Sequence, residues 1–281
     1  MTLRVLLSGA SGQLGSELVR AFDAPHYEVV APTRSQLDLE SRDSVLQAIC
    51  STEPDVVVHA GAWTEVDACE DDPERALRVN ALGTRHVQQG ARIVGADVCY
   101  ISTDYVFAGT SRQPYDEWAE PDPRSVYGRS KRGGELELDP DALIVRCSWL
   151  CGYHGRNFVK TMLRLAAERE EFGVVADQHG CPTFAEDLAG AIHRLVVARM
   201  SGTFHVTNQG ATTWYGLATA TLEAAGLRPE RIRPLTTAEY PTRAARPAYS
   251  VLDNAALRLQ GLPLLPDWRE SLERLVKELR T

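Results

Sequence analysis

The sequence has few lysines and no long apolar run. Only three of its 281 residues are lysine: Lys131, Lys160 and Lys277. No apolar stretch approaches the roughly 20 residues that a membrane-spanning helix needs, and the apolar run at the N-terminus is too short for a signal peptide. We therefore expect a cytoplasmic protein that has no membrane partner.

Metal-binding and hydrolase patterns are also missing. The six cysteines include no Cys-x-x-Cys pair, and the histidines show no His-x-x-x-His spacing. We predict reduced thiols and no metal site. The serines lack the Gly-x-Ser-x-Gly context of a nucleophile elbow, which argues against a serine hydrolase.

Composition describes an acidic globular protein. The chain has 30 basic and 38 acidic residues, a net charge of −8 and 44% hydrophobic residues. An excess of acidic charge disfavours nucleic acid as a partner. The length fits one large or two modest domains.

Strand-like and helix-like segments alternate through the first half, which is typical of a parallel sheet covered by helices on both faces. We predict a doubly wound α/β (Rossmann) domain over residues 1–149. A smaller α/β substrate lobe is expected over residues 150–281, with some of that chain returning to the Rossmann core. The expected strands are Val5–Ser8, Glu28–Ala31, Asp55–Ala60, Val98–Ser102 and Leu143–Arg146, and the expected helices are Gln13–Phe22, Ser44–Ser51, Pro73–Val94 and Val126–Leu138.

The second half is less regular. Its Pro- and Thr-rich stretch Pro234–Pro247 predicts a long surface loop. The other expected elements are helices at Asn157–Arg169 and Glu186–Ala198, a strand near Val174, a strand at Thr203–Val206, and helices starting near Trp214 and Trp268.

A glycine-rich loop follows the first strand. Gly9, Gly12 and Gly15 form a Gly-x-x-Gly-x-x-Gly pattern that opens a helix. Such glycines let the backbone approach a pyrophosphate, which the helix N-terminus then binds. A tight strand-to-helix turn is the alternative, but the position at the first strand-helix junction favours a dinucleotide.

The end of the second strand bears on the choice of nucleotide. NAD-binding domains usually carry an acidic residue at this position, whereas this chain has Arg34, flanked by Thr33 and Ser35. Arg34 favours the 2′-phosphate of NADPH, with NADH as the alternative, unless Arg34 is an ordinary exposed arginine. Asp38 follows at a position suited to the adenine amino group.

A tyrosine and a lysine lie one helical turn apart at Tyr127 and Lys131. A nearby ammonium, together with a cationic nicotinamide, stabilises a phenolate, so the pair predicts acid-base chemistry. Thr103, at the end of the fourth strand, is placed to donate to a substrate carbonyl oxygen. Capping of the next element is the alternative role for Thr103.

Together the glycine loop, Ser-Thr-Asp-Tyr-Val-Phe (102–107) and Tyr-Gly-x-x-Lys (127–131) resemble the extended short-chain dehydrogenases/reductases, and within them the dTDP-4-dehydrorhamnose reductases. The resemblance covers nearly the whole chain. It implies reduction of dTDP-4-dehydro-L-rhamnose to dTDP-L-rhamnose by NADPH, with a nucleotide sugar as the partner. It is compatible with a homodimer but does not fix the oligomeric state.

The resemblance also implies roles for individual residues. The catalytic residues would be Thr103, Tyr127 and Lys131. The cofactor would contact Gly9, Gly12, Gln13, Leu14, Arg34, Asp38, Leu39, Ala60, Ala62, Trp63, Thr64, Tyr127 and Lys131. The substrate would contact Thr103, Asp104, Trp149, Asn157, Lys160 and Arg246.

The chain departs from the family pattern at two positions, and two alternative functions remain open. The family commonly has Tyr or His at the position of Trp63 and a polar residue at that of Ala68. Some members dimerise through a magnesium site, which Glu17 alone does not establish. One alternative is a sugar-nucleotide epimerase or dehydratase of the same fold. The other is an NADP-binding regulatory subunit similar to the β subunit of methionine adenosyltransferase.

Overall fold

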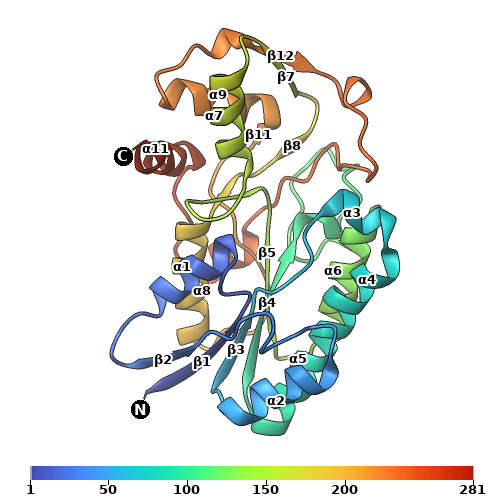
Figure 1. Cartoon of the computed structure of the whole chain (residues 1–281), viewed down its shortest axis with the longest axis vertical. Coiled ribbons are helices and arrows are strands. Elements are labelled where there is room, and N and C mark those ends of the chain that lie inside the picture. Colours follow the sequence, from blue (N-terminus) through green and yellow to red (C-terminus); the bar gives the residue numbers. More distant parts are fainter. Residues whose placement is uncertain (1, 281) are drawn as a thin grey trace.

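A six-stranded parallel sheet forms the centre of the lower lobe in Figure 1. The structure is a computed structural model and describes residues 2–280. The strand order is β10-β5-β4-β3-β1-β2, so the predicted doubly wound sheet is confirmed. The strands are β1 (Leu3–Ser8), β2 (Tyr27–Val30), β3 (Val56–His59), β4 (Asp97–Thr103), β5 (Leu143–Cys147) and β10 (Gly202–His205).

Helices cover both faces of this sheet because neighbouring residues of each central strand point to opposite faces. In β1, Val5 and Leu7 pack toward one helical layer and Leu6 toward the other. The first layer contains α1 (Gln13–Ala21) and α8 (Ala185–Val197). The second contains α2 (Arg42–Thr52), α5 (Gly83–Val94) and α6 (Val126–Leu136).

The segment predicted as one helix, Pro73–Val94, contains a change of helical type. It comprises α4 (Pro73–Leu77), the π-helical segment η1 (Arg78–Leu82) and α5. A further helix, α3 (Val66–Asp71), precedes it and was not predicted. Asp72 caps α4 by accepting from the Arg75 amide at 3.0 Å, as acidic residues commonly do at helix N-termini.

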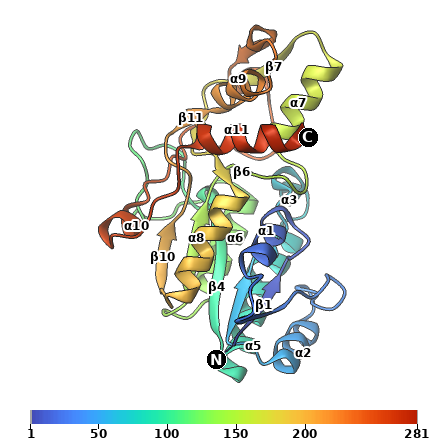
Figure 2. The same cartoon turned by 90° about the vertical axis from the view of Figure 1, so that its left-hand side faces the viewer.

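The upper lobe has its own apolar core (Figure 2). Helices α7 (Phe158–Glu168), α9 (Trp214–Ala224) and α11 (Trp268–Leu279) pack there, and Trp268 is fully buried among them. The parallel pair β7 (Phe172–Val175) and β12 (Ile232–Leu235) lies beside α9. Short pairs complete the second half: β6 (Leu150–Cys151) with β9 (Thr183–Phe184), and β8 (His179–Gly180) with β11 (Thr212–Thr213), followed by α10 (Ala255–Leu259).

The chain after residue 149 is shared between the two lobes. α8 packs on α1, and β10 pairs with β5 as the edge strand of the main sheet. Both elements were expected in the smaller lobe, but their apolar faces are buried against the Rossmann core. The division into residues 1–149 and 150–281 stays a prediction.

The 234–247 segment is only partly a loop. Its first residues, Pro234 and Leu235, belong to β12, and Thr237–Glu239 form a 3-10 turn. No helix within residues 2–280 is long and apolar enough to cross a membrane.

Candidate active site

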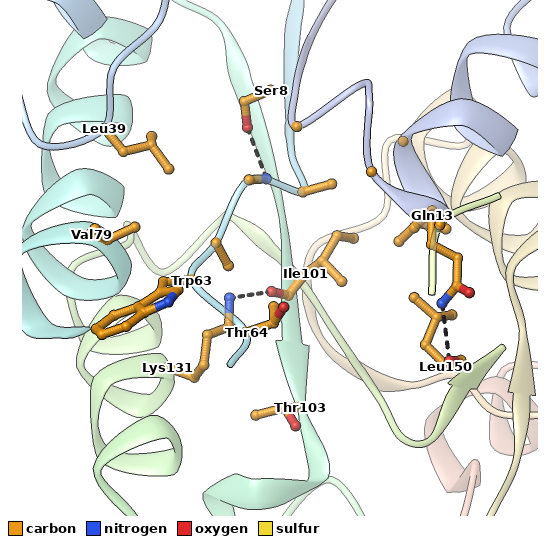
Figure 3. Close-up of a pocket in the computed structure, with 18 of the residues that line it drawn as sticks. Ser8, Gln13, Leu39, Trp63, Thr64, Val79, Ile101, Thr103, Lys131 and Leu150 are labelled. Atoms are coloured by element: carbon orange, nitrogen blue, oxygen red, sulfur yellow. Dashed lines mark hydrogen bonds between the residues drawn. The ribbon is translucent and has the colours of Figure 1, made fainter. Parts of the chain in front are cut away.

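A cavity of about 700 Å³ opens at the carboxyl ends of the central strands, which is where open α/β sheets bind their ligands. Its walls come from five strand ends, from α6 and from the start of α9. In Figure 3, Leu39 and Val79 lie toward one end of the pocket and Thr103 toward the other. Gln13 and Leu150 lie across the pocket from Trp63 and Lys131.

The glycine loop has no space for side chains where the chain turns. Gly9 has a φ of +75°, and a Cβ there would lie 2.7 Å from the Gly61 nitrogen. Gly12 precedes α1 without a side-chain cap, so the first-turn amides of the helix face the pocket unpaired. This cradle and the helix dipole fit a pyrophosphate.

Gln13 joins the glycine loop to the second half of the chain. Its side-chain nitrogen donates to the Leu150 carbonyl oxygen at 3.0 Å, and its side-chain oxygen accepts from the Asn157 amide at 2.7 Å. Leu14 lines the same wall. These two hydrogen bonds fix the Gln13 side chain at the start of α1.

Charged side chains gather where β2 ends. Arg34 lines the pocket together with Asp38 and Leu39. Arg75 lines it as well and stacks its guanidinium 4.6 Å from the centre of the Trp63 ring. Arg75 was not singled out from the sequence, because it lies on α4, about sixty residues beyond the glycine-loop motif.

One buried amide connects the 60–64 loop to the catalytic helix. Asn80 lies in η1 and is 1% exposed. Its oxygen accepts from the Trp63 amide at 2.8 Å, and its nitrogen donates to the Trp63 carbonyl at 3.0 Å and to Ser130 Oγ at 2.9 Å. Ser130 in turn donates to the Tyr127 carbonyl at 2.8 Å.

Lys131 lies deep in the pocket, 2% exposed. Its ammonium donates to the Ile101 carbonyl at 2.6 Å and lies 4.0 Å from the centre of the Tyr100 ring (Figure 3). Burial lowers the pKa of Lys131 to about 7. The α6 backbone approaches β4 closely here, since a Cβ on Gly134 would lie 2.3 Å from the Tyr100 hydroxyl.

Tyr127 is buried beside Thr103 and Cys147 in the same pocket. Burial raises the pKa of Tyr127 well above that of a free phenol, and the hydrogen bond with Thr103 offsets only part of this. The protein's own groups therefore hold the phenol protonated at neutral pH. A protonated phenol is a proton donor, not a base.

Asp104 adds a buried carboxyl group to this end of the pocket. It is 2% exposed; one oxygen accepts from Thr103 Oγ1 at 3.1 Å, and the other makes no close hydrogen bond within residues 2–280, although the Ser250 hydroxyl is near enough to lower the pKa of the carboxyl. Burial raises the pKa of Asp104 to about 6. The unpartnered oxygen is chemically suited to a substrate hydroxyl.

An aromatic stack forms the wall nearest the upper lobe. The Trp149 and Trp214 rings are stacked, with centres 3.6 Å apart and planes 10° from parallel. Trp149 has a φ of +47°, a strained value for a bulky residue. Both rings line the pocket and offer an apolar face to a flat ligand.

Comparison with known proteins assigns a family. The family model of the RmlD substrate binding domain matches residues 3–281. The chain belongs to this family. The resemblance to dTDP-4-dehydrorhamnose reductases that the motifs indicated is thereby confirmed.

Individual relatives match over almost the full length. The dTDP-4-dehydrorhamnose reductase of Streptomyces griseus is 44% identical over 278 residues, which cover 96% of this chain and 91% of that protein. The dTDP-4-keto-6-deoxy-D-glucose reductase of Streptomyces niveus is 42% identical over 276 residues, which cover 97% of this chain and 96% of that protein. A solved dTDP-4-dehydrorhamnose reductase of Bacillus anthracis in complex with NADP has a TM-score of 0.96 and 40% sequence identity. The match covers 99% of this chain and 100% of that one.

Most residues expected from the RmlD-family motifs line one pocket. These are Gly9, Gly12, Gln13, Leu14, Arg34, Asp38, Leu39, Ala60, Ala62, Trp63, Thr64, Thr103, Asp104, Tyr127, Lys131 and Trp149. Their individual roles stay predictions.

Three residues expected to meet the substrate pyrophosphate do not line the pocket. Asn157 caps α7 and donates to Gln13 and to the Gly152 carbonyl. Lys160 donates to the Gly155 carbonyl at 3.1 Å, and Arg246 pairs with Asp67 at 2.7 Å. The side chains of Asn157 and Lys160 are thus engaged with the protein itself, whereas Arg246 keeps one buried nitrogen, Nη1, without a partner within residues 2–280.

The fold also brings in residues that no motif indicated. Arg156 lines the pocket next to Gly155, and Trp214 joins from α9. Trp214 was expected only to start a helix, as it does. The Thr-capped helix start is a sequence signal for the helix, but the stacking of Trp214 on Trp149 depends on tertiary packing.

Proposed function

We propose that this protein reduces dTDP-4-dehydro-L-rhamnose to dTDP-L-rhamnose with NADPH. The observation that carries the proposal is that Tyr127, Thr103 and Lys131 are buried together in the pocket that the glycine loop also lines. The family membership and the names of the relatives support the choice of substrate. NADPH, when bound, supplies the hydride that adds to C4 of the sugar.

The residues present fit this cofactor. The glycine cradle of Gly9 and Gly12 would hold the pyrophosphate, with Gln13 and Leu14. Arg34 would contact the 2′-phosphate, and Asp38 and Leu39 the adenine. Ala60, Ala62, Trp63 and Thr64 would line the nicotinamide half, and Lys131 would bind the adjoining ribose.

Tyr127 would deliver the proton that the reduced oxygen needs. Thr103 would donate a hydrogen bond to that oxygen as negative charge develops on it. Lys131, buried in the same pocket, would stabilise in its protonated form the phenolate that remains. Asp104 and Trp149 would orient the sugar nucleotide.

The relatives favour a reductase over an epimerase or dehydratase. The matched proteins of Streptomyces griseus and Streptomyces niveus, 44% and 42% identical over nearly the whole chain, are both named as reductases of a dTDP-linked keto sugar. The cytoplasmic location and a homodimer remain part of the proposal, supported by the family resemblance alone.

The test follows NADPH oxidation at 340 nm with enzymatically made dTDP-4-dehydro-L-rhamnose. The Tyr127→Phe variant should lose most of the turnover, about 100-fold or more for removal of a general acid, while NADPH binding is retained. Tyr153→Phe, which removes an exposed phenol outside the pocket, is the matched control.

Two results would contradict the proposal. Turnover of dTDP-4-keto-6-deoxy-D-glucose but not of the rhamnose precursor would replace the substrate. Tight NADPH binding with no turnover of either sugar would favour the regulatory-subunit alternative.

A further inference from the structure

Three arginines surround one carboxylate at the end of the cofactor pocket. Glu40 Oε1 lies 3.8 Å from Arg34 Nη2 and 3.5 Å from Arg75 Nε, and Glu40 Oε2 lies 3.7 Å from Arg78 Nε. The Glu40 side chain is 30% exposed and the Arg34 side chain 77% exposed. The protein thus places an anion of its own among the cations expected to receive a phosphate.

This carboxylate belongs to the ribose end of the pocket. Glu40 lines the main cavity and also an adjoining hollow with Thr33, Arg34, Ser35 and Asp38. The Glu40 amide donates to Asp38 Oδ1 at 3.1 Å, which closes the turn that carries the side chain there. Glu40 therefore supplies the acidic group that the tip of β2 lacks in sequence.

The arginines are not locked onto Glu40. Hydrogen-bonded Arg–carboxylate pairs have N–O distances of about 2.7–2.9 Å, whereas these three pairs are 3.5–3.8 Å long. Arg34 and Arg75 can turn from Glu40 to another anion without breaking a hydrogen bond to it. They remain within a charged cluster that Glu40 partly neutralises.

We propose that Glu40 is a specificity-determining residue that opposes the 2′-phosphate of NADPH by competing with it for Arg34 and Arg75. The inference rests on the proposed function for the identity of the cofactor. In NADH the 2′-position carries a hydroxyl, which can donate a hydrogen bond to the Glu40 carboxylate. Glu40 thus weakens the preference that Arg34 alone would give.

The direction in which Glu40 shifts the cofactor preference follows from the charges of the groups involved. A phosphomonoester carries a charge of about −1.5 to −2 near neutral pH, so a carboxylate among the same arginines repels it. The NADH hydroxyl carries no charge and is not repelled. Removing the Glu40 charge should therefore strengthen NADPH binding and leave NADH binding unchanged or slightly weaker.

The experiment measures dissociation constants of the full-length protein for NADPH and NADH by fluorescence titration. Glu40→Gln should raise the ratio of NADPH to NADH affinity about tenfold, the effect of roughly 1.4 kcal/mol. Arg75→Gln should lower it. Because exposed charges are screened, both changes should shrink at high salt.

Glu74→Gln is the matched control. Glu74 is an 89% exposed partner of Arg78 on the same helix and does not line the pocket. The same loss of charge there should leave the ratio unchanged.

The outcomes separate the two proposals. An unchanged ratio in Glu40→Gln, with NADPH still bound by the wild type, would overturn the role of Glu40 alone. A lower ratio of NADPH to NADH affinity would show that Glu40 orients the arginines for the phosphate. This result would also overturn the proposal that Glu40 opposes NADPH. Failure of the wild type to bind either nucleotide would contradict the proposed function too.

Discussion

Asp104 combines burial with an unsatisfied oxygen at the substrate end of the pocket. Burial destabilises the charged form of such a carboxylate, and this raises the pKa of Asp104 from 3.8 to about 6. In the folded protein the group is therefore neutral at mildly acidic pH and charged above it. Its effect on stability must depend on pH.

The sign of that dependence can be worked out. Between pH 3.8 and about 6 the folded state binds more protons at Asp104 than the unfolded state does, so Asp104 lowers the free energy of unfolding as pH rises. Asp104→Asn removes the titration. The variant should gain stability relative to wild type across this range, by up to about 1.4 kcal/mol per pH unit, and the gain should level off above pH 6.

Urea denaturation of the cofactor-free protein from pH 4 to 8 measures this difference. Asp141→Asn, at an exposed carboxylate, is the control and should show no such trend. A constant difference between Asp104→Asn and wild type over the whole range would contradict the prediction.

Sequence spacing was sufficient for the residues that lie close to a motif. Tyr127 and Lys131 share a helix face, and Thr103 ends a strand that any parallel sheet would place next to that helix. It was not sufficient for Glu40. No carboxylate stands at the tip of β2, and only the turn before α2 carries Glu40 back to the ribose end of the pocket.

The helical segment from α4 to α5 illustrates the same limit for whole elements. Its apolar spacing predicted one helix, but the spacing carries no sign of the π-helical segment that places Asn80 against the 60–64 loop. π-Helical turns are frequent at functional sites. Here the π-helical turn places the Asn80 amide in contact with both the 60–64 loop and α6.

Asn80→Ala should therefore weaken NADPH binding. It removes two hydrogen bonds to the Trp63 backbone, at 2.8 and 3.0 Å, each worth about 1 kcal/mol. If half of that free energy, about 1 kcal/mol, is lost from binding, the affinity for NADPH falls about fivefold. Equilibrium titration with NADPH measures it.

A general loss of stability would give a different pattern. Gln88→Ala, at a buried amide of α5 that pairs with Asp139 outside the pocket, should lower thermal stability to a similar extent and leave NADPH affinity unchanged. Equal affinities for NADPH in the Asn80 and Gln88 variants would refute the positioning role of Asn80.

At the scale of the molecule, a segment from the second half reaches back to the Rossmann domain. After β12 the chain descends toward α3 (Figure 1), where Asp67 accepts from the Ala244 amide at 3.0 Å and from Arg246 at 2.7 Å. Arg243 pairs with Asp71 on the same helix. The loop predicted from Pro- and Thr-rich composition thus bridges the two parts of the chain beside the site.

Asp67 should therefore control substrate binding more than cofactor binding. Asp67→Asn keeps an acceptor for the Ala244 amide but removes the charged partner of Arg246, whose side chain is 18% exposed and has one buried nitrogen without a partner within residues 2–280. A weakened bridge should raise the KM for the nucleotide sugar about fivefold to tenfold, equivalent to roughly 1 to 1.4 kcal/mol. NADPH affinity should not change, because the cofactor cradle lies on the β1–α1 side of the pocket.

Asp71→Asn provides the comparison within the same bridge. Its pair with Arg243 is exposed on both sides, at 54% and 66%, and exposed pairs contribute little, so the KM should stay near the wild-type value. Steady-state kinetics and NADPH titration on the same preparations separate the effects. If Asp67→Asn weakened NADPH binding as much as substrate binding, the bridge would be holding the Rossmann domain itself in shape, since only a distortion of that domain reaches both ligands.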